Sequence, residues 1–356
     1  MQKITNIEIK NFKSIRQAEI KDCRRINVFI GYPNVGKSNI LEALSLFSIN
    51  EYSSDFSNYV RMEAPTTLFF DGDVSKSSEV RINNKHRVIA KFENFQISFI
   101  KQFEKDGISF ENYDNGHSLF DRSIEVTELN KFGVSNKNGK NNIVDYRIGF
   151  VPDEYKLEYI KKYSFIKNSF TDGIGYIELS APFGENLFNV ILANKELKEE
   201  IENLFESYNL KFSFDTTSQS FIILKFIGNN VFSIPYSLVA DTLQRLIFYK
   251  ATIASNKNSI LLFEEPEAHM FPPYIAKFTS DIIFDDNKNQ YFIATHSPFV
   301  LNDFMEELKD DELSIYTVGL EDGATVINRL TDEQITEIYQ YGIDLFFNLE
   351  NFLKNG

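Results

Sequence analysis

The stretch Gly31-Tyr32-Pro33-Asn34-Val35-Gly36-Lys37-Ser38 (GYPNVGKS) decides the fold. Residues 25–30 before it (RINVFI) predict a short buried strand, and residues 39–47 after it (NILEALSLF) predict a helix with an apolar face. A GxxxxGKS sequence between a strand and a helix is typical of a P-loop, in which backbone N–H groups and a helix N-terminus surround phosphates. Because both flanking elements are expected here, a triphosphate-binding loop is favoured over an ordinary glycine-containing turn.

The side chains of this loop have separate predicted roles. Lys37 would reach the β- and γ-phosphates, and the hydroxyl of Ser38 would bind Mg²⁺. The predicted nucleotide contacts of this segment are Gly31, Asn34, Val35, Gly36, Lys37, Ser38 and Asn39.

A similar sequence pattern is also found in the P-loop of translation-type GTPases. Those proteins carry an Asn-Lys-x-Asp sequence further along the chain. The two candidates here are residues 194–197 (NKEL) and 256–259 (NKNS), and both lack the aspartate that pairs with guanine. The sequence therefore favours ATP over GTP.

A second motif lies at residues 260–269 (ILLFEEPEAH). Its apolar start predicts a buried strand, and two carboxylates follow at the C-terminal end, where α/β sheets bind ligands. Glu264 would hold Mg²⁺ directly or through water, and Glu265 would polarise the attacking water. A third buried strand is predicted at residues 291–294, and His296 after it could contact the γ-phosphate.

These three motifs, in this order, resemble ABC-type ATPases of the SMC, RecF and OLD group. Residues 4–15 (ITNIEIKNFKSI), 174–188 (IGYIELSAPFGENLF) and 233–245 (SIPYSLVADTLQR) carry the likeness further, and it covers residues 1–50 and 174–300. The resemblance implies an α/β P-loop ABC-type head, ATP and Mg²⁺ as cofactors, and Lys13 of the Asn-Phe-Lys-Ser turn as a further ATP contact. It also implies a head-to-tail homodimer in which each subunit completes the other's site.

Two positions depart from the pattern of that group. Glu264 stands where aspartate is usual, and Thr242 stands where the signature helix normally has glycine. Asp241 is expected to cap this helix, because aspartate is a favoured N-cap residue. Contact with the partner's nucleotide would then fall to Ser237, Thr242 or Arg245, and hydrolysis could be slow.

The predicted organisation is one ATPase fold with an insertion. Lys37 and Glu264 must meet at one nucleotide, so much of the chain between them is expected to form an inserted lobe of mixed α and β structure. The expected parts are the first ATPase half (1–50), the inserted lobe (51–173), the second half (174–320) and a C-terminal helical segment (321–356).

Several local elements are expected outside the motifs. The following are predicted: strands at 87–92 and 96–100, a surface loop or hairpin tip at 133–142, helical structure around 152–165 and at 186–207, and a capped helix from 331 with a break at Gly342.

Composition limits the partners. The chain has 356 residues, a net charge of −14 and a single cysteine, Cys23. The acidic balance argues against non-specific coating of nucleic acid, and the lone cysteine excludes an internal disulfide. No apolar run is long enough for a bilayer, and no N-terminal signal is evident, so a cytoplasmic protein without a membrane partner is expected. Basic and aromatic residues interleave between 131 and 167, which leaves DNA binding possible.

The favoured function is an ABC-type ATPase that dimerises around ATP and regulates a separately encoded effector, such as a nuclease or toxin. The resemblance to small stand-alone bacterial members implies a place in anti-phage defence. Two alternatives remain: a RecF-like repair ATPase that binds DNA, and a nucleotide-dependent scaffold that does not hydrolyse ATP.

Overall fold

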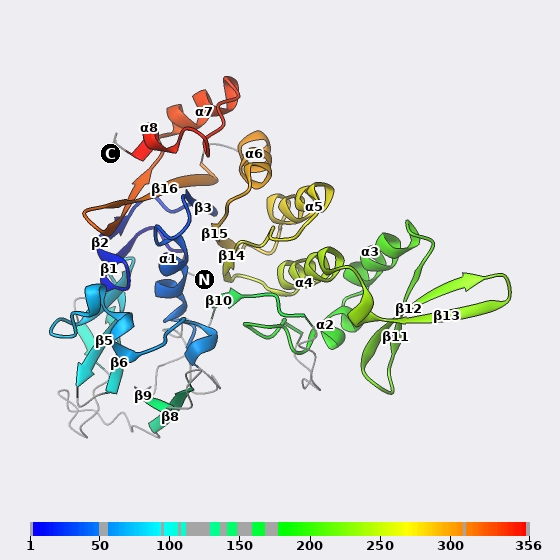
Figure 1. The fold of residues 1–356 in the computed structure, drawn as a ribbon, viewed down its shortest axis with the longest axis horizontal. Coiled ribbons are helices and arrows are strands. Elements are labelled where there is room, and N and C mark those ends of the chain that lie inside the picture. The colour runs from blue at the N-terminus through cyan, green and yellow to red at the C-terminus, as the bar shows by residue number, and fades with distance from the viewer. Residues whose placement is uncertain are drawn as a thin grey trace.

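The computed structural model describes residues 3–49, 56–93, 96–105, 108–111, 129–135, 141–147, 159–167, 177–308 and 311–353. Within these residues the strands form three sheets (Figure 1). The central sheet is mostly parallel and carries the motif strands, so the fold is the α/β class that the sequence predicted. None of the described helices is both long and apolar enough to cross a bilayer.

The central sheet has the order β10-β14-β15-β3-β16-β17. Its first five strands run parallel, and β17 is antiparallel to β16. The bounds are Ile160–Tyr163 (β10), Ile260–Glu264 (β14), Gln290–Ala294 (β15), Ile26–Gly31 (β3), Leu313–Glu321 (β16) and Ala324–Arg329 (β17). The predicted strands at 25–30, 260–263 and 291–294 are confirmed.

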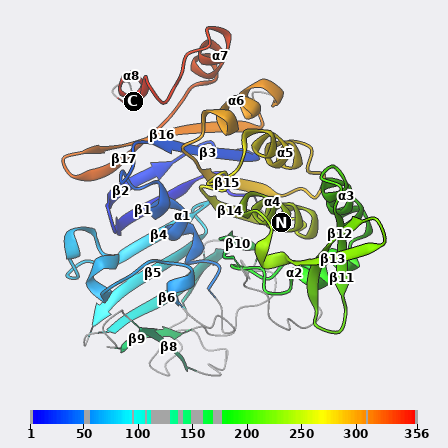
Figure 2. The same ribbon diagram turned by 45° about the vertical axis from the view of Figure 1, so that its right-hand side comes forward.

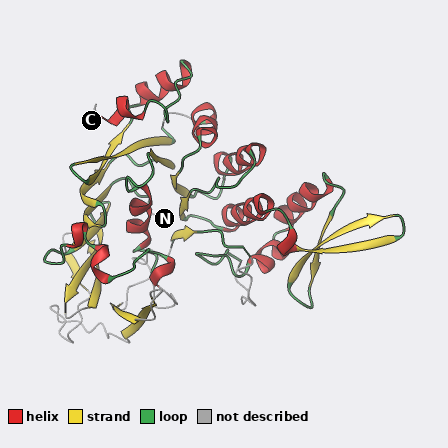
Figure 3. Ribbon diagram, in the orientation of Figure 1, coloured by secondary structure: helices red, strands yellow, loops and turns green. Residues whose placement is uncertain are grey.

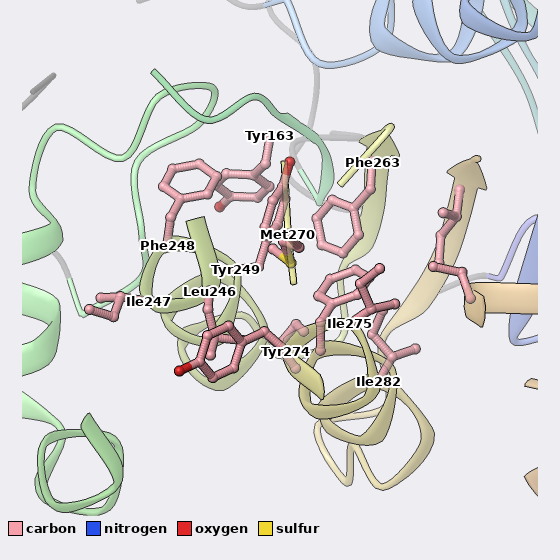
Figure 4. Close-up of a cluster of buried hydrophobic side chains, with 14 of the residues drawn as sticks. Tyr163, Leu246, Ile247, Phe248, Tyr249, Phe263, Met270, Tyr274, Ile275 and Ile282 are labelled. Atoms are coloured by element: carbon pink, nitrogen blue, oxygen red, sulfur yellow. The ribbon is translucent and has the colours of Figure 1, made fainter. Parts of the chain in front are cut away.

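Apolar residues of this sheet face two cores in alternation, because successive side chains of a strand point to opposite faces. In β14, Leu261 and Phe263 belong to one core, while Ile260 and Leu262 belong to the other. Helices α4 (Asp241–Ser255), α5 (Pro272–Ile283) and α6 (Pro298–Glu307) cover the first face. Figure 4 shows aromatic and aliphatic side chains of α4 and α5 meeting Phe263 in this core.

The opposite core lies between the central sheet and a larger, mostly antiparallel sheet, with α1 (Lys37–Ser45) between the two (Figures 1 and 2). That sheet has the order β2-β1-β4-β5-β6-β9-β8, and β7 pairs with β6. The bounds are Ile7–Phe12 (β1), Ile15–Ile20 (β2), Ser78–Ile82 (β4), His86–Glu93 (β5), Gln96–Lys105 (β6), Ile108–Glu111 (β7), Leu129–Ser135 (β8) and Asn141–Arg147 (β9). The predicted strands at 87–92 and 96–100 lie within β5 and β6.

The boundary expected at residue 50 does not separate two structural units. β1 pairs antiparallel with β4, so the N-terminal strands and the segment after residue 50 share one sheet. A second difference is β10, which is a strand inside the region expected to be helical; residues 152–158 lie outside the described part. The predicted loop at 133–142 partly overlaps β8 and β9, which are antiparallel neighbours.

A small third sheet projects from the helical side of the molecule (Figure 3). It consists of β11 (Lys211–Asp215), β12 (Ser220–Ile227) and β13 (Asn230–Pro235). The predicted helix at 186–207 is two helices, α2 (Leu187–Ala193) and α3 (Lys195–Glu206). Asn194 divides them, because its extended backbone ends α2 and its side chain accepts from the Leu197 N–H to cap α3.

The C-terminal part completes the central sheet before it turns helical. Strand β17 begins after the predicted boundary at 320, so the sheet continues to Arg329. Helix α7 (Asp332–Gln340) follows, then α8 (Leu349–Leu353). Short 3₁₀ turns occur at Phe56–Asn58 (η1), Pro65–Leu68 (η2), Phe70–Gly72 (η3) and Tyr236–Leu238 (η5).

The predicted capping box of α7 is confirmed. The Thr331 hydroxyl accepts from the Gln334 N–H at 3.2 Å, and the Gln334 side chain accepts from the Thr331 N–H at 2.9 Å. Gly342, with φ of 60°, follows the helix where a break was expected.

We expect Thr331→Ala to lower the free energy of unfolding by about 1 kcal/mol, because an N-cap acceptor is lost. Urea denaturation followed by circular dichroism measures this. Thr336→Ala is the matched control, since this exposed threonine lies inside the same helix and accepts no cap bond. Equal effects of the two substitutions would contradict the capping role.

Candidate functional site

The loop between β3 and α1 has the backbone that a P-loop requires. Asn34 and Gly36 have φ of 61° and 104°, in the left-handed region that glycine and asparagine tolerate best. A Cβ on Gly36 would lie 2.2 Å from the Thr325 hydroxyl oxygen, so only glycine fits. The Lys37 ammonium donates to the carbonyl oxygens of Gly31 at 3.0 Å and Tyr32 at 2.8 Å, which holds it over the loop.

Side-chain hydroxyl groups hold this loop in place by hydrogen bonds. Thr325 of β17 donates to the Val35 carbonyl at 2.8 Å, and its oxygen lies 2.7 Å from the Ser14 hydroxyl. The Asn39 amide donates to Ser14 at 2.6 Å, so Asn39 braces the loop from α1. Sequence reasoning missed Thr325, because a residue almost 300 positions away gave no local signal.

Glu264 ends β14 close to Ser38, the other residue predicted to bind the metal. Their role as metal ligands stays a prediction. Arg61 Nη2 lies 3.0 Å from Glu264 Oε1, and Lys162 Nζ lies 3.6 Å from Oε2. Burial alone would raise the pKa of Glu264, but Lys162, Ser38 and Arg61 outweigh it and hold the pKa below its usual value.

Glu265 and His296 face each other across the end of the sheet. His296 Nε2 lies 3.5 Å from Glu265 Oε1. Glu265 has φ of 44°, a conformation that costs energy for a non-glycine residue and is concentrated at functional sites. Its backbone N–H donates to the Ala294 carbonyl at 2.8 Å, so β15 holds the strained position in place. The structure thus brings together Glu265, predicted to polarise the attacking water, and His296, predicted to contact the γ-phosphate.

A third glutamate of the same motif, Glu267, holds the backbone of His296 by a hydrogen bond. Buried Glu267 accepts from the Thr295 hydroxyl at 2.6 Å and from the His296 N–H at 3.0 Å through one oxygen. Burial raises the pKa of Glu267, although these hydrogen bonds oppose the shift. Glu267 was not singled out from the sequence, where it is one of three glutamates in the motif.

Lys13 lies beside the site, but its ammonium group is paired with residues outside the P-loop. Its ammonium donates to the carboxylate of Glu42 and to the Arg61 carbonyl at 2.7 Å. Glu42 projects from α1 with a fully buried side chain, and its other oxygen accepts from Arg61 Nε at 2.6 Å. The assignment of Lys13 to the nucleotide stays a prediction.

The signature region is arranged differently from the expectation. Ala240 is the N-cap residue of α4, so the prediction that Asp241 caps this helix is wrong. Asp241 instead accepts from Arg245 Nε at 2.9 Å, one turn along the helix, and the Arg245 guanidinium lies 4.8 Å from the centre of the Phe165 ring.

The other two signature candidates lie at the same end of α4. Thr242 accepts from the Phe271 N–H at 3.1 Å, and Ser237 lies in η5, partly exposed. Contact of Ser237, Thr242 or Arg245 with a partner's nucleotide stays a prediction.

The basic and aromatic residues considered for DNA contact lie mostly outside the described side chains. Of the described members, Tyr163 is fully buried, Lys161 bonds Glu178 at 2.5 Å and Asn256 at 2.7 Å, and Lys162 points to Glu264. DNA contact by this region stays a prediction.

The residues present fit a magnesium-nucleotide. The described residues contain no cluster of three or more His, Cys, Asp and Glu that could hold a metal alone. Mg²⁺ in phosphate sites takes one or two protein oxygens and completes its shell with phosphates and water. The Ser38 hydroxyl and the Glu264 carboxylate supply such oxygens beside the P-loop.

Taken together, the parallel sheet, the P-loop, the paired carboxylates and the facing histidine define a P-loop ATPase. Residues 26–302 match the family described as "AAA domain, putative AbiEii toxin, Type IV TA system". The chain belongs to this family, and it is an ABC-type ATPase of the SMC, RecF and OLD group.

The chain is also similar to individual proteins and to solved structures. The chain is 25% identical to "Uncharacterized protein MJECL44" of Methanocaldococcus jannaschii, over 68% of this chain and 79% of that protein. It is 22% identical to an "ATP/GTP phosphatase" of Helicobacter pylori, over 83% and 85% respectively. Among solved structures, an SMC head bound to the C-terminal winged-helix domain of ScpA is similar in fold, with a TM-score of 0.51, 15% identity, and 95% of this chain and 100% of that chain covered.

Nucleotide affinity should depend on the protonation of Lys37. Burial lowers the pKa of Lys37 to about 8, against the opposing effect of Glu265 and Glu264. Because the charged ammonium attracts phosphate, we expect affinity for an ATP analogue to be constant below pH 7 and to fall as the pH rises through 8. Fluorescence titration between pH 6 and pH 9.5 measures this, and affinity that is flat across the range would contradict it.

Proposed function

We propose that the protein binds and hydrolyses ATP with Mg²⁺, dimerises around the nucleotide and regulates a separately encoded effector in anti-phage defence. The observation that supports hydrolysis is the pairing of Glu265 with His296 at 3.5 Å. Glu265 directly follows Glu264, which lies beside Ser38. The family description names a putative toxin and a type IV TA system, which supports a defence context and a partner protein.

Each of the site residues has a separate proposed role in hydrolysis. Lys37 and the P-loop N–H groups would bind the β- and γ-phosphates, and Ser38 with Glu264 would hold Mg²⁺, which would offset the charge that develops on the phosphates. Glu265 orients the attacking water and accepts its proton. Burial and nearby Lys37 lower the pKa of His296, which favours the neutral imidazole, and its ring can hydrogen-bond the γ-phosphate or the water.

Dimerisation would place the start of α4 against a second subunit. Leu238, just before this helix, is 73% exposed, and Ser237 and Thr242 flank it with hydroxyl groups. In the proposed dimer the partner would cover the Leu238 side chain and remove its apolar surface from water. The name of the SMC head structure, which is bound to a ScpA domain, supports partner binding by this fold.

Glu265→Gln should reduce ATP hydrolysis by at least about 100-fold, because a general base is lost. Binding of Mg²⁺-ATP should persist, since Ser38, Glu264 and Lys37 are unchanged. Phosphate release and calorimetry measure the two quantities. Glu333→Gln, on exposed α7, is the control, and Lys37→Ala is the variant that should lose nucleotide binding.

Hydrolysis by Glu265→Gln at the wild-type rate would move the catalytic role elsewhere, with His296 the next candidate. A wild-type protein that binds ATP without turnover would instead support the scaffold alternative.

Leu238→Glu should abolish ATP-dependent dimerisation and leave nucleotide binding by the monomer unchanged, because a buried charge in the interface would lack a partner. Sedimentation velocity with and without ATP, on the Glu265→Gln background, measures it. Leu320→Glu is the control, since Leu320 is 53% exposed on β16. A dimer that ignores both ATP and Leu238→Glu would show that the subunits meet through another surface.

A further inference from the structure

Both carboxylate oxygens of Glu264 face cations of the chain itself. Arg61 is 3.0 Å from Oε1 and Lys162 is 3.6 Å from Oε2. Mg²⁺ would need one of these oxygens, directly or through water. The chain's own cations and the metal therefore compete for one carboxylate.

Arg61 is anchored on its other side. Its Nε donates to Glu42 at 2.6 Å, and the Glu42 carboxylate is fully buried and also bonded by Lys13. Since the planar guanidinium presents separate N–H groups, it can leave Glu264 while Nε stays on Glu42. The Arg61 side chain is 62% exposed, so water can replace the contact that is broken.

Lys162 is held more firmly. Its side chain is 5% exposed, its ammonium lies 3.3 Å from the Tyr59 carbonyl oxygen, and its backbone is part of β10, paired with β14. Its burial and its contact with the Tyr59 carbonyl oxygen restrict the movement of this lysine away from Glu264. It is a buried positive charge beside the predicted metal position.

We propose that Arg61 is a displaceable substitute for Mg²⁺ on Glu264, and that Lys162 is a permanent cation that sets the metal affinity of the site. When the metal-nucleotide binds, Arg61 leaves Oε1 and remains on Glu42. Glu264 thus stays charge-balanced in both states. The inference rests on the proposed role of Glu264 as a metal ligand, and it adds two positioning residues to the site.

The test measures binding of a fluorescent ATP analogue as a function of Mg²⁺ concentration, and again in EDTA. In Arg61→Gln, the half-saturating Mg²⁺ concentration should fall by about threefold to fivefold, the size expected for an exposed ion pair. Affinity in EDTA should not change. In Lys162→Met the fall should be larger, about tenfold, because this cation is buried.

Two further variants make the result specific. Arg61→Lys keeps a cation near Glu42 but lacks the guanidinium fork, so it should shift the Mg²⁺ dependence in the same direction as Arg61→Gln. Arg81→Gln is the matched control, because Arg81 pairs with Glu79 on β4 and should change nothing.

An unchanged or raised half-saturating Mg²⁺ concentration in Arg61→Gln would overturn the inference. Weaker binding of the analogue in EDTA would also overturn it, since Arg61 would then contact the nucleotide itself. Failure of the wild-type protein to bind nucleotide in either condition would reject the proposed function instead, so the two failures are distinguishable.

Discussion

The register of three parallel strands is the constraint on which the site depends. Glu264 of β14 pairs with Ala294 of β15, which pairs with Phe29 of β3. The three strands therefore end at the same edge of the sheet. The P-loop, Glu265 and His296 lie in the segments that follow these strands. A slip of one residue would turn the buried side chains of a strand to the opposite core. Alternating burial against two cores thus fixes the register, and the register fixes the catalytic geometry.

The second constraint is the burial of charge. Glu42 is fully buried on the helix that begins at the P-loop, and an unpaired carboxylate there would be costly. Lys13, from the turn between β1 and β2, and Arg61, from the segment after α1, supply the two cations. These ion pairs connect the antiparallel sheet to the P-loop helix, which explains why the chain after residue 50 does not behave as a separable insertion. The same Arg61 reaches Glu264, so one cation links the two carboxylates.

The sequence predicted the parts of the site whose signals are local. The P-loop, the strand ending in Glu264 and the strand before His296 each have a short motif next to an apolar run. Contacts between distant segments had no such signal. These are the contact of Thr325 with the P-loop and the contacts of Arg61 and Lys162 with Glu264. Local reasoning also failed where tertiary pairing overrode it. Strand β10 was expected to be helical, but it is the edge strand of the central sheet and pairs with β14. Boundaries drawn from motifs missed the β1–β4 pairing for the same reason.

The signature helix shows how a local ion pair can limit a contact between subunits. Asp241 and Arg245 are one turn apart, and such pairs form readily on a helix surface. Their bond at 2.9 Å and the position of Arg245 on Phe165 leave the guanidinium side chain only 18% exposed. Arg245 Nε is bonded to Asp241, so only the remaining N–H groups of this guanidinium could reach a partner's phosphate. The neighbouring exposed groups at this end of the helix are apolar Leu238 and the Asp241 carboxylate, 38% exposed, beside the partly exposed hydroxyls of Ser237 and Thr242, and none of these four side chains is a cation that could stabilise developing negative charge. In the proposed dimer, this arrangement would let ATP close the interface while giving little stabilisation to the charge that develops during hydrolysis.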